Sequence, residues 1–495
     1  MGAHRFLAFD LGASSGRAFL GRLDGHSLAL SEVSRFDNAM VPIRGGLYWN
    51  VVELLQQILR GIEAGESSGQ RPESLGIDTW GVDFGLLAPD GSLIGLPRAY
   101  RDPRLDGAMD GFLQIVPREK VYQLTGIQVM RINTLYQLYA MVRDRWPLLK
   151  CATDLLMMPD LFNYLLTGEK RAEFTIGTTS QLYNPRKDTW ASELFDALQL
   201  SPAMMQEVVQ PGSVIGTTNA DAPQESRMKG IPVVATASHD TAAAVAAVPA
   251  EGKDWAYISS GTWSLMGVES DKPIITEESL ALNFSNEGGV NRTFRVLKNI
   301  SGLWLVQQCR QAWAREKLYS YEELMECAAE AAGFDSIIEP DDPDFVNPPD
   351  MPGAIQEYCR RTGQLAPTGI GDTLRCILVS LALKYRLVLE QLRRIYPHPI
   401  SRIHVIGGGS RNELLCQLAA DATGLPVLAG PAEATVIGNL LVQAMGLGCL
   451  ASPQQLREVV RSSFEMKRYA PRDTRGWESA YQRFQELQAD GAEPV

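Results

Sequence analysis

Two segments, one in each half of the chain, share a pattern of apolar strands separated by a short turn of small polar residues. The first covers residues 6–23 and reads FLAFDLGASSGRAFLGRL. The second covers residues 255–270 and reads WAYISSGTWSLMGVES. Short apolar runs bounded by turn residues are typical of strands. The pattern therefore predicts one β-hairpin at residues 6–23 and another at residues 255–270.

Longer segments carry the spacing of amphipathic helices. The predicted helices are NTLYQLYAMVRDRW (133–146), DLLMMPDLFNYLLTG (154–168), GDTLRCILVSLALKYRLVLEQLRRIY (371–396) and a final surface helix, TRGWESAYQRFQELQ (474–488). The long helix runs into an apolar strand, RIHVIGG, and we expect the tail at 490–495 to be frayed. Hairpins followed by crossover helices predict α/β layers in each half.

A chain of 495 residues is too long for one ordinary core. The segment IPVVATASHDTAAAVAAV ends at residue 248, where Pro249 and Gly252 interrupt the helical pattern. We therefore predict an N-terminal domain at 1–248, a C-terminal domain at 253–450 and a helical tail at 451–495.

Composition narrows the class of protein. Hydrophobic residues make up 45% and charged residues 21%, as in ordinary globular proteins. The net charge of -12 repels nucleic acids and anionic membranes, so we expect neither as a partner. The sequence shows neither an apolar signal core nor a run of membrane-spanning length, which predicts a cytoplasmic protein. The seven cysteines contain no CxxC and are expected to be reduced, although Cys359 and Cys376 could meet in space.

The first turn has the composition of a phosphate-binding loop. Small residues let backbone N–H groups approach phosphate oxygens closely. Asp10, which precedes the turn, could face a phosphate-bound Mg²⁺, and Arg17 could neutralise transferring charge. A plain hairpin loop is the alternative. The turn itself consists of Gly12, Ala13, Ser14, Ser15 and Gly16.

Two further segments suit a nucleotide. The turn from Ser259 to Thr262 offers the same small polar residues as the first turn, and two such turns could hold one polyphosphate. The segment from Gly407 to Gly409, between a buried strand and a helix that starts near Asn412, would let a nucleotide base and ribose lie against backbone. A purely structural turn is equally compatible with it. The chain contains neither GxxxxGK[ST] nor a GxGxxG fingerprint here, which disfavours P-loop and dinucleotide-binding folds.

Candidate chemistry also follows two other strands. Asp240 stands at a helix start after an apolar strand, where it could be an N-cap or a general base for a substrate hydroxyl. His239 could be an ordinary polar residue or a hydrogen-bonding partner of the substrate. In SLGIDTWGVDFGLLAPDGSLIG a strand ends at Asp78 and Thr79, and a hairpin is expected around Asp90. Trp80 beside Gly81 could contact a sugar, but core packing is the favoured interpretation.

Together these residues resemble a known family, the FGGY carbohydrate kinases, whose fold is shared with hexokinase, actin and the Hsp70 ATPase domain. The resemblance rests on motifs in order along the chain: DLGASSGR, GIDTWGVDF, AYRD, NTLYQL, LLMMPDLFNYLLTG, ASHDTA, SSGTWSLMG, NEGG, LKNISGLW and IGGGSRN. It implies an α/β chain of two ribonuclease H-like domains with an active-site cleft between them. The tetrapeptide FGGY itself does not occur.

Within the family, the motifs are similar to those of the branch that transfers the γ-phosphate of ATP to O1 of L-rhamnulose, with Mg²⁺, in L-rhamnose breakdown. The resemblance implies that Asp240 is the proton acceptor and that Asp10 lies near the metal. The nucleotide positions that it implies are Ala13, Ser14, Ser15, Gly16, Arg17, Thr262, Gln307 and Gly408. The sugar positions are Gly81, His239, Asp240, Thr241 and Asn299.

Three alternatives stay open at this point. The chain could phosphorylate another substrate of the same family, such as L-fuculose, xylulose or glycerol. It could be a chaperone or filament ATPase of the same fold that acts on a protein partner. A catalytically inactive sugar sensor is disfavoured by the presence of Asp10, Asp240 and both hairpins. The expected assembly is a monomer or a weak homo-oligomer.

Overall fold

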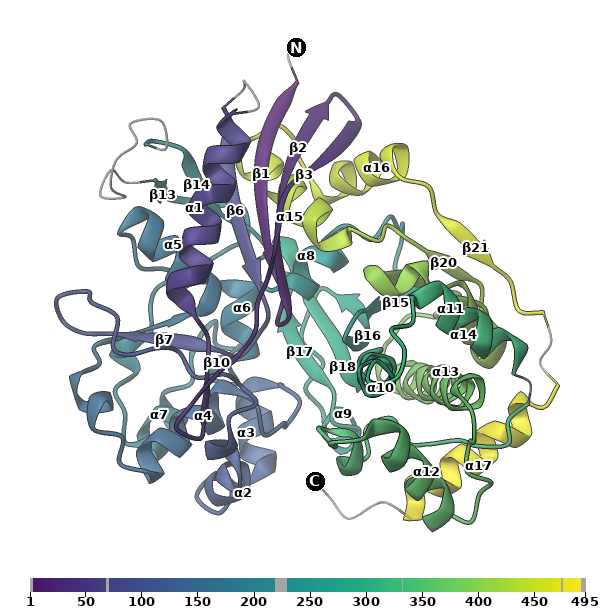
Figure 1. The fold of residues 1–495 in the computed structure, drawn as a ribbon. Coiled ribbons are helices and arrows are strands. Elements are labelled where there is room, and N and C mark those ends of the chain that lie inside the picture. The colour runs from purple at the N-terminus through teal and green to yellow at the C-terminus, as the bar shows by residue number, and fades with distance from the viewer. Residues whose placement is uncertain (1–2, 68–70, 219–228, 332, 473–474, 491–495) are drawn as a thin grey trace. The chain divides into compact units, whose positions relative to one another are not determined.

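The computed structural model describes residues 3–67, 71–218, 229–331, 333–472 and 475–490 (Figure 1). The chain forms two compact units. Unit 1 contains residues 1–251, 269–296 and 434–464, and unit 2 contains residues 252–268, 297–433 and 465–495. Neither unit is a single continuous stretch of sequence. The predicted fraying at 490–495 concerns residues that, from 491 on, lie outside the described part.

Unit 1 is built on a six-stranded sheet in the order β13-β14-β6-β1-β2-β3. Strands β1 and β2 pair antiparallel, which confirms the predicted opening hairpin, while β6 pairs in parallel with both β1 and β14. The strand bounds are β1 His4–Leu11, β2 Ser15–Asp24, β3 Ser27–Asp37, β6 Ser74–Thr79, β13 Ser213–Thr217 and β14 Pro232–Ala235.

The two faces of this sheet pack against different helices because side chains alternate along a strand. Leu7 and Phe9 of β1 belong to the same buried cluster as Leu54 and Ile58 of α1 (Val51–Ser67). On the other face, α15 (Ala434–Gly446) lies so close to β6 that a Cβ at Gly76 would meet the side chains of that helix. The sheet is therefore covered on both faces.

Helices α15 and α8 (Asp240–Ala246) approach each other at backbone distance. A Cβ added at Gly438 would lie 1.8 Å from the carbonyl oxygen of Ala243. Only a residue without a side chain fits this contact. The close approach fixes the helix that begins at Asp240 against the sheet layer.

The remaining elements of unit 1 include one correction. The predicted helix at 154–168 begins as strand β8 (Asp154–Met157), which pairs antiparallel with β7 (Phe84–Leu87), and becomes helix α5 only at Met158, with Pro159 in its first turn. The predicted hairpin around Asp90 is correspondingly short: it has one antiparallel bridge, between Leu87 at the end of β7 and Leu93. The predicted helix at 133–146 is confirmed as α4 (Thr134–Arg143).

The other bounds in unit 1 are β4 Val41–Ile43, β5 Gly46–Tyr48, α2 Ala108–Leu113, α3 Arg118–Thr125, α5 Met158–Thr167, β9 Ala172–Glu173, α6 Phe174–Thr179, β10 Tyr183–Asn184, β11 Thr189–Trp190, α7 Ser192–Leu198, β12 Val208–Val209, α9 Glu277–Ala281, β17 Ser285–Gly288 and α16 Pro453–Ser463.

Unit 2 repeats the design of a hairpin whose first strand pairs in parallel with a later strand. Strands β15 and β16 pair antiparallel, as predicted, and β15 pairs in parallel with β19, which pairs in parallel with β20. The predicted long helix is confirmed as α13. The final predicted helix is confirmed as α17, and the apolar side chains on one of its faces are buried. The bounds are β15 Trp255–Ser260, β16 Trp263–Ser270, β18 Phe294–Ser301, α10 Trp304–Trp313, α11 Tyr321–Glu330, α12 Met351–Arg361, α13 Ile370–Ile395, β19 Arg402–Ile406, α14 Glu413–Thr423, β20 Val427–Ala429, β21 Lys467–Tyr469 and α17 Trp477–Asp490.

All seven cysteines carry free thiols. Cys359 and Cys376, which we expected could meet, are both buried, and a hydrogen bond between them lowers the pKa of Cys359. Among the described residues, no helix combines the length and the apolar character that crossing a membrane requires.

Candidate active site

The turn between β1 and β2 is fixed by its own backbone and by the residue that follows β3. The N–H of Gly12 donates to the carbonyl oxygen of Ser15 at 2.9 Å, and the side chain of Asn38 donates to the carbonyl oxygen of Gly12 at 2.8 Å. Ser14 is exposed at the tip. The turn therefore holds one shape with its small residues, Ala13 to Gly16, at the end of the hairpin. Sequence reasoning did not single out Asn38.

Asp10 and Arg17 form an ion pair beside this turn. They occupy directly opposite positions on β1 and β2, and Nη2 of Arg17 donates to Oδ2 of Asp10 at 2.6 Å. On its other side, Asp10 is paired in the parallel register with Asp78 of β6. Two carboxylates thus lie next to each other across β1 and β6.

Asp78 is fully buried, and sequence reasoning gave it no role beyond the end of a strand. Its Oδ2 accepts a hydrogen bond from Nδ2 of Asn439 at 2.6 Å, whereas Oδ1 has no hydrogen-bonding partner among the described residues. Burial, and after it the negative charge of Asp10, raises the pKa of Asp78 well above its ordinary value. The same pKa is raised further by Asp240, which shows that these three acidic residues interact electrostatically.

The turn at Gly81 is followed by a buried carboxylate, Asp83, whose hydrogen bonds fix the residues around the turn. Oδ2 of Asp83 accepts the indole N–H groups of Trp49 at 2.6 Å and Trp80 at 3.0 Å, and Oδ1 accepts from Gln137 at 2.9 Å. Burial raises the pKa of Asp83 to about 6 in spite of these donors. Trp80 is buried, so the expectation of core packing is confirmed.

Strain accompanies this turn. Val82 has φ +68°, a conformation that β-branched residues rarely adopt. Its carbonyl oxygen accepts from the hydroxyl of Thr134 at 2.6 Å, and its N–H donates to the hydroxyl of Thr179 at 3.3 Å. These contacts fix the backbone of Gly81 against His239, since a Cβ at Gly81 would lie 3.4 Å from Nε2 of that histidine.

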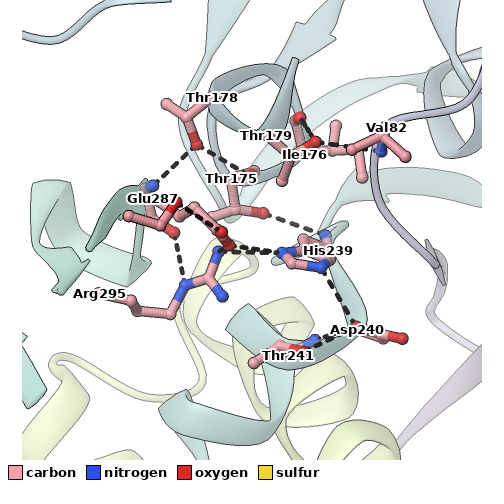
Figure 2. Close-up of polar contacts among 12 residues, drawn as sticks. Val82, Thr175, Ile176, Thr178, Thr179, His239, Asp240, Thr241, Glu287 and Arg295 are labelled. Atoms are coloured by element: carbon pink, nitrogen blue, oxygen red, sulfur yellow. Dashed lines mark hydrogen bonds and ion pairs between the residues drawn. The ribbon is translucent and has the colours of Figure 1, made fainter. Parts of the chain in front are cut away.

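Asp240 is the first residue of α8, and its carboxylate is used asymmetrically (Figure 2). Oδ1 accepts from the backbone N–H and the hydroxyl of Thr241 and lies 3.4 Å from Nε2 of His239. No described residue donates to Oδ2. His239 occupies the N-cap position instead, and neither residue is an N-cap through its side chain. The carboxylate is 32% exposed, so one oxygen is available to an incoming hydroxyl.

Behind His239 lies a buried ion pair that sequence reasoning missed. Nδ1 of His239 is 3.0 Å from Nη2 of Arg295 and 3.3 Å from Oε2 of Glu287, and those two side chains are 3.1 Å apart (Figure 2). Burial has the largest single effect on the pKa of Glu287 and raises it, but the positive charge of Arg295, together with smaller contributions from His239 and Ser285, lowers this pKa to about 2. Glu287 belongs to the NEGG motif, but nothing in its sequence context indicated a contact with His239.

In unit 2 the predicted nucleotide positions gather around the second hairpin. Gly407 and Gly409 press against Ser260, where a Cβ would lie 2.9 Å and 2.0 Å from atoms of that residue. Gly408 faces open space. Thr262, in the turn, and Gln307, on α10, are 3.5 Å apart through their side chains.

The structure thus brings the predicted residues together in two groups. Unit 1 holds the first hairpin, Asp10 and the sugar positions Gly81, His239, Asp240 and Thr241. Unit 2 holds Thr262, Gln307 and Gly408, together with Asn299 on β18, which we had assigned to the sugar.

Comparison with known proteins identifies the family. Residues 5–246 match the model of the N-terminal domain of the FGGY family of carbohydrate kinases, and residues 256–447 match that of its C-terminal domain. The chain belongs to the FGGY family of carbohydrate kinases. It is therefore a phosphotransferase that uses ATP and has an alcohol acceptor. The alternative of a chaperone or filament ATPase is not supported.

Relatives in this family cover nearly the full length of the chain. A rhamnulokinase of Bacteroides thetaiotaomicron is 47% identical over 97% of this chain and 98% of its own. A rhamnulokinase of Pectobacterium carotovorum is 43% identical, covering 98% and 97%. Among solved structures, a gluconate kinase of Lactobacillus acidophilus matches with a TM-score of 0.80 at 14% identity over 99% of each chain. A Plasmodium falciparum glycerol kinase with ADP matches with a TM-score of 0.79 at 11% identity, over 100% of this chain and 99% of its own. The structures confirm the two-domain α/β fold of FGGY kinases.

The donors near the first turn suit Mg²⁺. Carboxylate oxygens are the ligands that this cation prefers. Asp10 offers one at the base of the turn, and Asp78, one strand away, has a buried oxygen without a hydrogen-bonding partner among the described residues. Arg17 already engages Oδ2 of Asp10, so a cation would share this carboxylate with the guanidinium. The residues present therefore fit the metal.

Proposed function

We propose that this chain transfers the γ-phosphate of ATP to O1 of L-rhamnulose, giving L-rhamnulose 1-phosphate in L-rhamnose catabolism. The choice of sugar is supported by relatives of 42–47% identity that are named rhamnulokinases and match nearly the full chain. We place the reaction in the cytoplasm and expect a monomer or a weak homo-oligomer.

The observation that carries the proposed mechanism is the asymmetry of the Asp240 carboxylate. Donors from Thr241, and His239 beside them, occupy Oδ1, and Oδ2 is left for the proton of the attacking hydroxyl. Phosphoryl transfer of this kind depends more on positioning and charge neutralisation than on strong base power. A weakly basic carboxylate that is held in one orientation is sufficient for this task.

The sugar would be oriented by Gly81, His239 and Thr241, with Asn299 contributing from β18. His239 presents a ring nitrogen beside Asp240, and the backbone of Gly81 lies close to that nitrogen, where a Cβ would come within 3.4 Å of it. Hydrogen bonds from fixed groups discriminate strongly between sugars because a mismatched hydroxyl leaves a buried donor or acceptor unpaired.

ATP would be bound by both groups of predicted residues. The turn from Ala13 to Gly16 offers backbone N–H groups to the phosphates, and Arg17 offers positive charge. Thr262 and Gln307 would contact the nucleotide in unit 2, and Gly408 would lie against the adenosine. Asp10 would hold Mg²⁺, which supplies further charge neutralisation to the phosphates.

A panel of sugars tests this proposal. ADP release should depend on L-rhamnulose and be far slower with L-fuculose, xylulose and glycerol, and the product should carry phosphate at O1 by ³¹P and ¹³C NMR. A clear preference for another acceptor, or phosphate on another oxygen, would contradict the assignment. Release of ADP at the same rate without any sugar would contradict the kinase reaction itself.

A further inference from the structure

The NEGG motif and the buried arginine that follows it have no part in the function described so far. Glu287 and Arg295 form an ion pair that lies against His239 rather than on the surface. Arg295 is 0% exposed. Fully buried arginines are rare, and a buried ion pair seldom stabilises a fold more than apolar residues of the same size would. Its position beside the candidate active site therefore calls for a role there.

We propose that Arg295 and Glu287 are positioning residues that hold His239 as the neutral tautomer with its proton on Nε2. The inference deepens the proposed function and rests on the roles given there to His239 and Asp240.

The contacts at Nδ1 decide which nitrogen carries the proton. Nη2 of Arg295 is 3.0 Å from Nδ1 of His239, and a guanidinium can only donate. Oε2 of Glu287 is also near this nitrogen, at 3.3 Å, but the guanidinium is closer and is a donor to both groups. The shorter contact makes Nδ1 the acceptor, with its lone pair directed at the arginine. The proton of a neutral imidazole consequently sits on Nε2.

The contacts at the other end of the ring agree with this tautomer. Nε2 of His239 lies 3.4 Å from Oδ1 of Asp240, so a proton there faces a carboxylate oxygen. The opposite tautomer would turn a lone pair toward that oxygen and an N–H toward the guanidinium. That tautomer would gain Oε2 of Glu287 as an acceptor at 3.3 Å, but it would set its N–H against the closer guanidinium and its lone pair against the carboxylate of Asp240.

Glu287 keeps Arg295 in position. Oε2 of Glu287 lies 3.1 Å from Nη2 of Arg295, while Oε1 accepts from the hydroxyl of Ser285 at 3.0 Å. Nε of Arg295 donates to the carbonyl oxygen of Gly288 at 2.8 Å, so both ends of the guanidinium group are anchored on strand β17. The N–H of Gly288 in turn donates to Thr178 at 2.8 Å (Figure 2).

The backbone of His239 is fixed separately. Its N–H donates to the hydroxyl of Thr175 at 3.1 Å, and that hydroxyl donates to Oε2 of Glu173 at 2.6 Å. With the backbone held by Thr175 and the ring held by Arg295, Nε2–H can only point along the side where Asp240 and Gly81 lie. The imidazole is thereby a fixed donor for Asp240 or for a sugar hydroxyl.

The direct test is ¹⁵N NMR of the histidine side chains, which does not depend on activity toward any sugar. The chain has five histidines, and His239→Asn identifies the signal of interest. The expected wild-type spectrum at neutral pH shows Nδ1 unprotonated and Nε2 protonated. A proton on Nδ1, in the other tautomer or in an imidazolium, would overturn the proposal.

Substitutions at Arg295 distinguish a role in orienting the His239 ring from a role in filling space. In Arg295→Met the donor to Nδ1 is lost and Oε2 of Glu287, already 3.3 Å away, is left as the polar neighbour of this nitrogen, so Nδ1 should become protonated. The KM for L-rhamnulose should rise, or kcat should fall, by about 10-fold, the equivalent of one hydrogen bond to a charged group, while the KM for ATP stays unchanged. Arg295→Lys retains a donor and should keep Nδ1 unprotonated with kinetics near those of wild type.

A matched control is Arg457→Met, which breaks another largely buried ion pair of unit 1, with Glu269. It should lower stability without altering either KM. Wild-type kinetics in Arg295→Met despite a proton on Nδ1 would contradict the positioning role. If Arg295→Met does not fold, the spectra of the wild type and of Arg295→Lys still decide the tautomer.

Discussion

Asp10 and Asp78 face each other across the parallel strands β1 and β6, in paired register. The pKa of Asp78 is raised well above its ordinary value of 3.8, first by burial and then by the charge of Asp10. The folded state therefore binds more protons than the unfolded state above that value, and stability declines as the pH rises. Asp78→Asn should remove this decline.

At pH 8 the Asp78→Asn variant should be more stable than the wild type, and this difference should shrink as the pH falls. Urea unfolding at several pH values measures the difference. Parallel stability curves for the two proteins between pH 4 and pH 8 would show that Asp78 does not titrate abnormally.

The contacts of Asp83 predict that tryptophan fluorescence changes with pH. Its carboxylate accepts the indole N–H groups of Trp49 and Trp80, and its pKa is raised from 3.8 to about 6. Protonation near pH 6 should change the tryptophan emission. The raised pKa also means that this group's contribution to stability is full below pH 3.8 and is lost as the pH rises through 6. Asp83→Asn should abolish the transition, and its persistence in the variant would assign it to another group.

Glu287 predicts the opposite pH dependence. Its pKa falls from 4.5 to about 2 in the folded state, so its stabilising effect is present above pH 4.5 and is lost as the pH falls toward 2. Glu287→Gln should cost about 3 kcal/mol at pH 7, the free-energy equivalent of lowering the pKa from 4.5 to about 2. Chemical unfolding should show this deficit shrinking below pH 4.5, whereas a deficit that is constant with pH would contradict the ion pair.

Gly438 predicts a purely steric effect. Gly438→Ala would place a Cβ 1.8 Å from the carbonyl oxygen of Ala243, a backbone atom that cannot move aside. Overpacking of this kind should lower the unfolding free energy by about 1–3 kcal/mol or more. Gly65→Ala on α1 is the matched control because its Cβ would meet Leu7 at an ordinary 3.4 Å. Thermal unfolding should separate the two variants, and equal Tm values would contradict the close approach.

Local patterns predicted much of the fold and the central residues of the site. Both hairpins, the long helix α13 and the strand that leads to Asp240 follow from apolar runs and turn residues that lie within one segment. The start of α5 did not follow, because the pairing of residues 154–157 with β7 depends on a partner strand that lies elsewhere in the sequence.

The support of the site could not be predicted for the same reason. Asn439 reaches Asp78 from a helix 361 positions away in the sequence, and Arg295 reaches His239 from a segment 56 positions away. The register that pairs Asp10 with Asp78 also depends on the path of the intervening chain. Such contacts arise from tertiary packing, which residue periodicity does not encode.

The measurement that tests the account most directly is the turnover of Asp240→Asn with L-rhamnulose and ATP. Loss of a general base should lower kcat by about 10²–10⁴-fold. The Kd for ATP, measured by calorimetry, should stay within about threefold of the wild-type value. This is a smaller change than the tenfold that about 1.4 kcal/mol of binding free energy would produce. Asp110→Asn, at an exposed carboxylate on α2, controls for the loss of one negative charge. A kcat near that of wild type in Asp240→Asn would contradict the central claim.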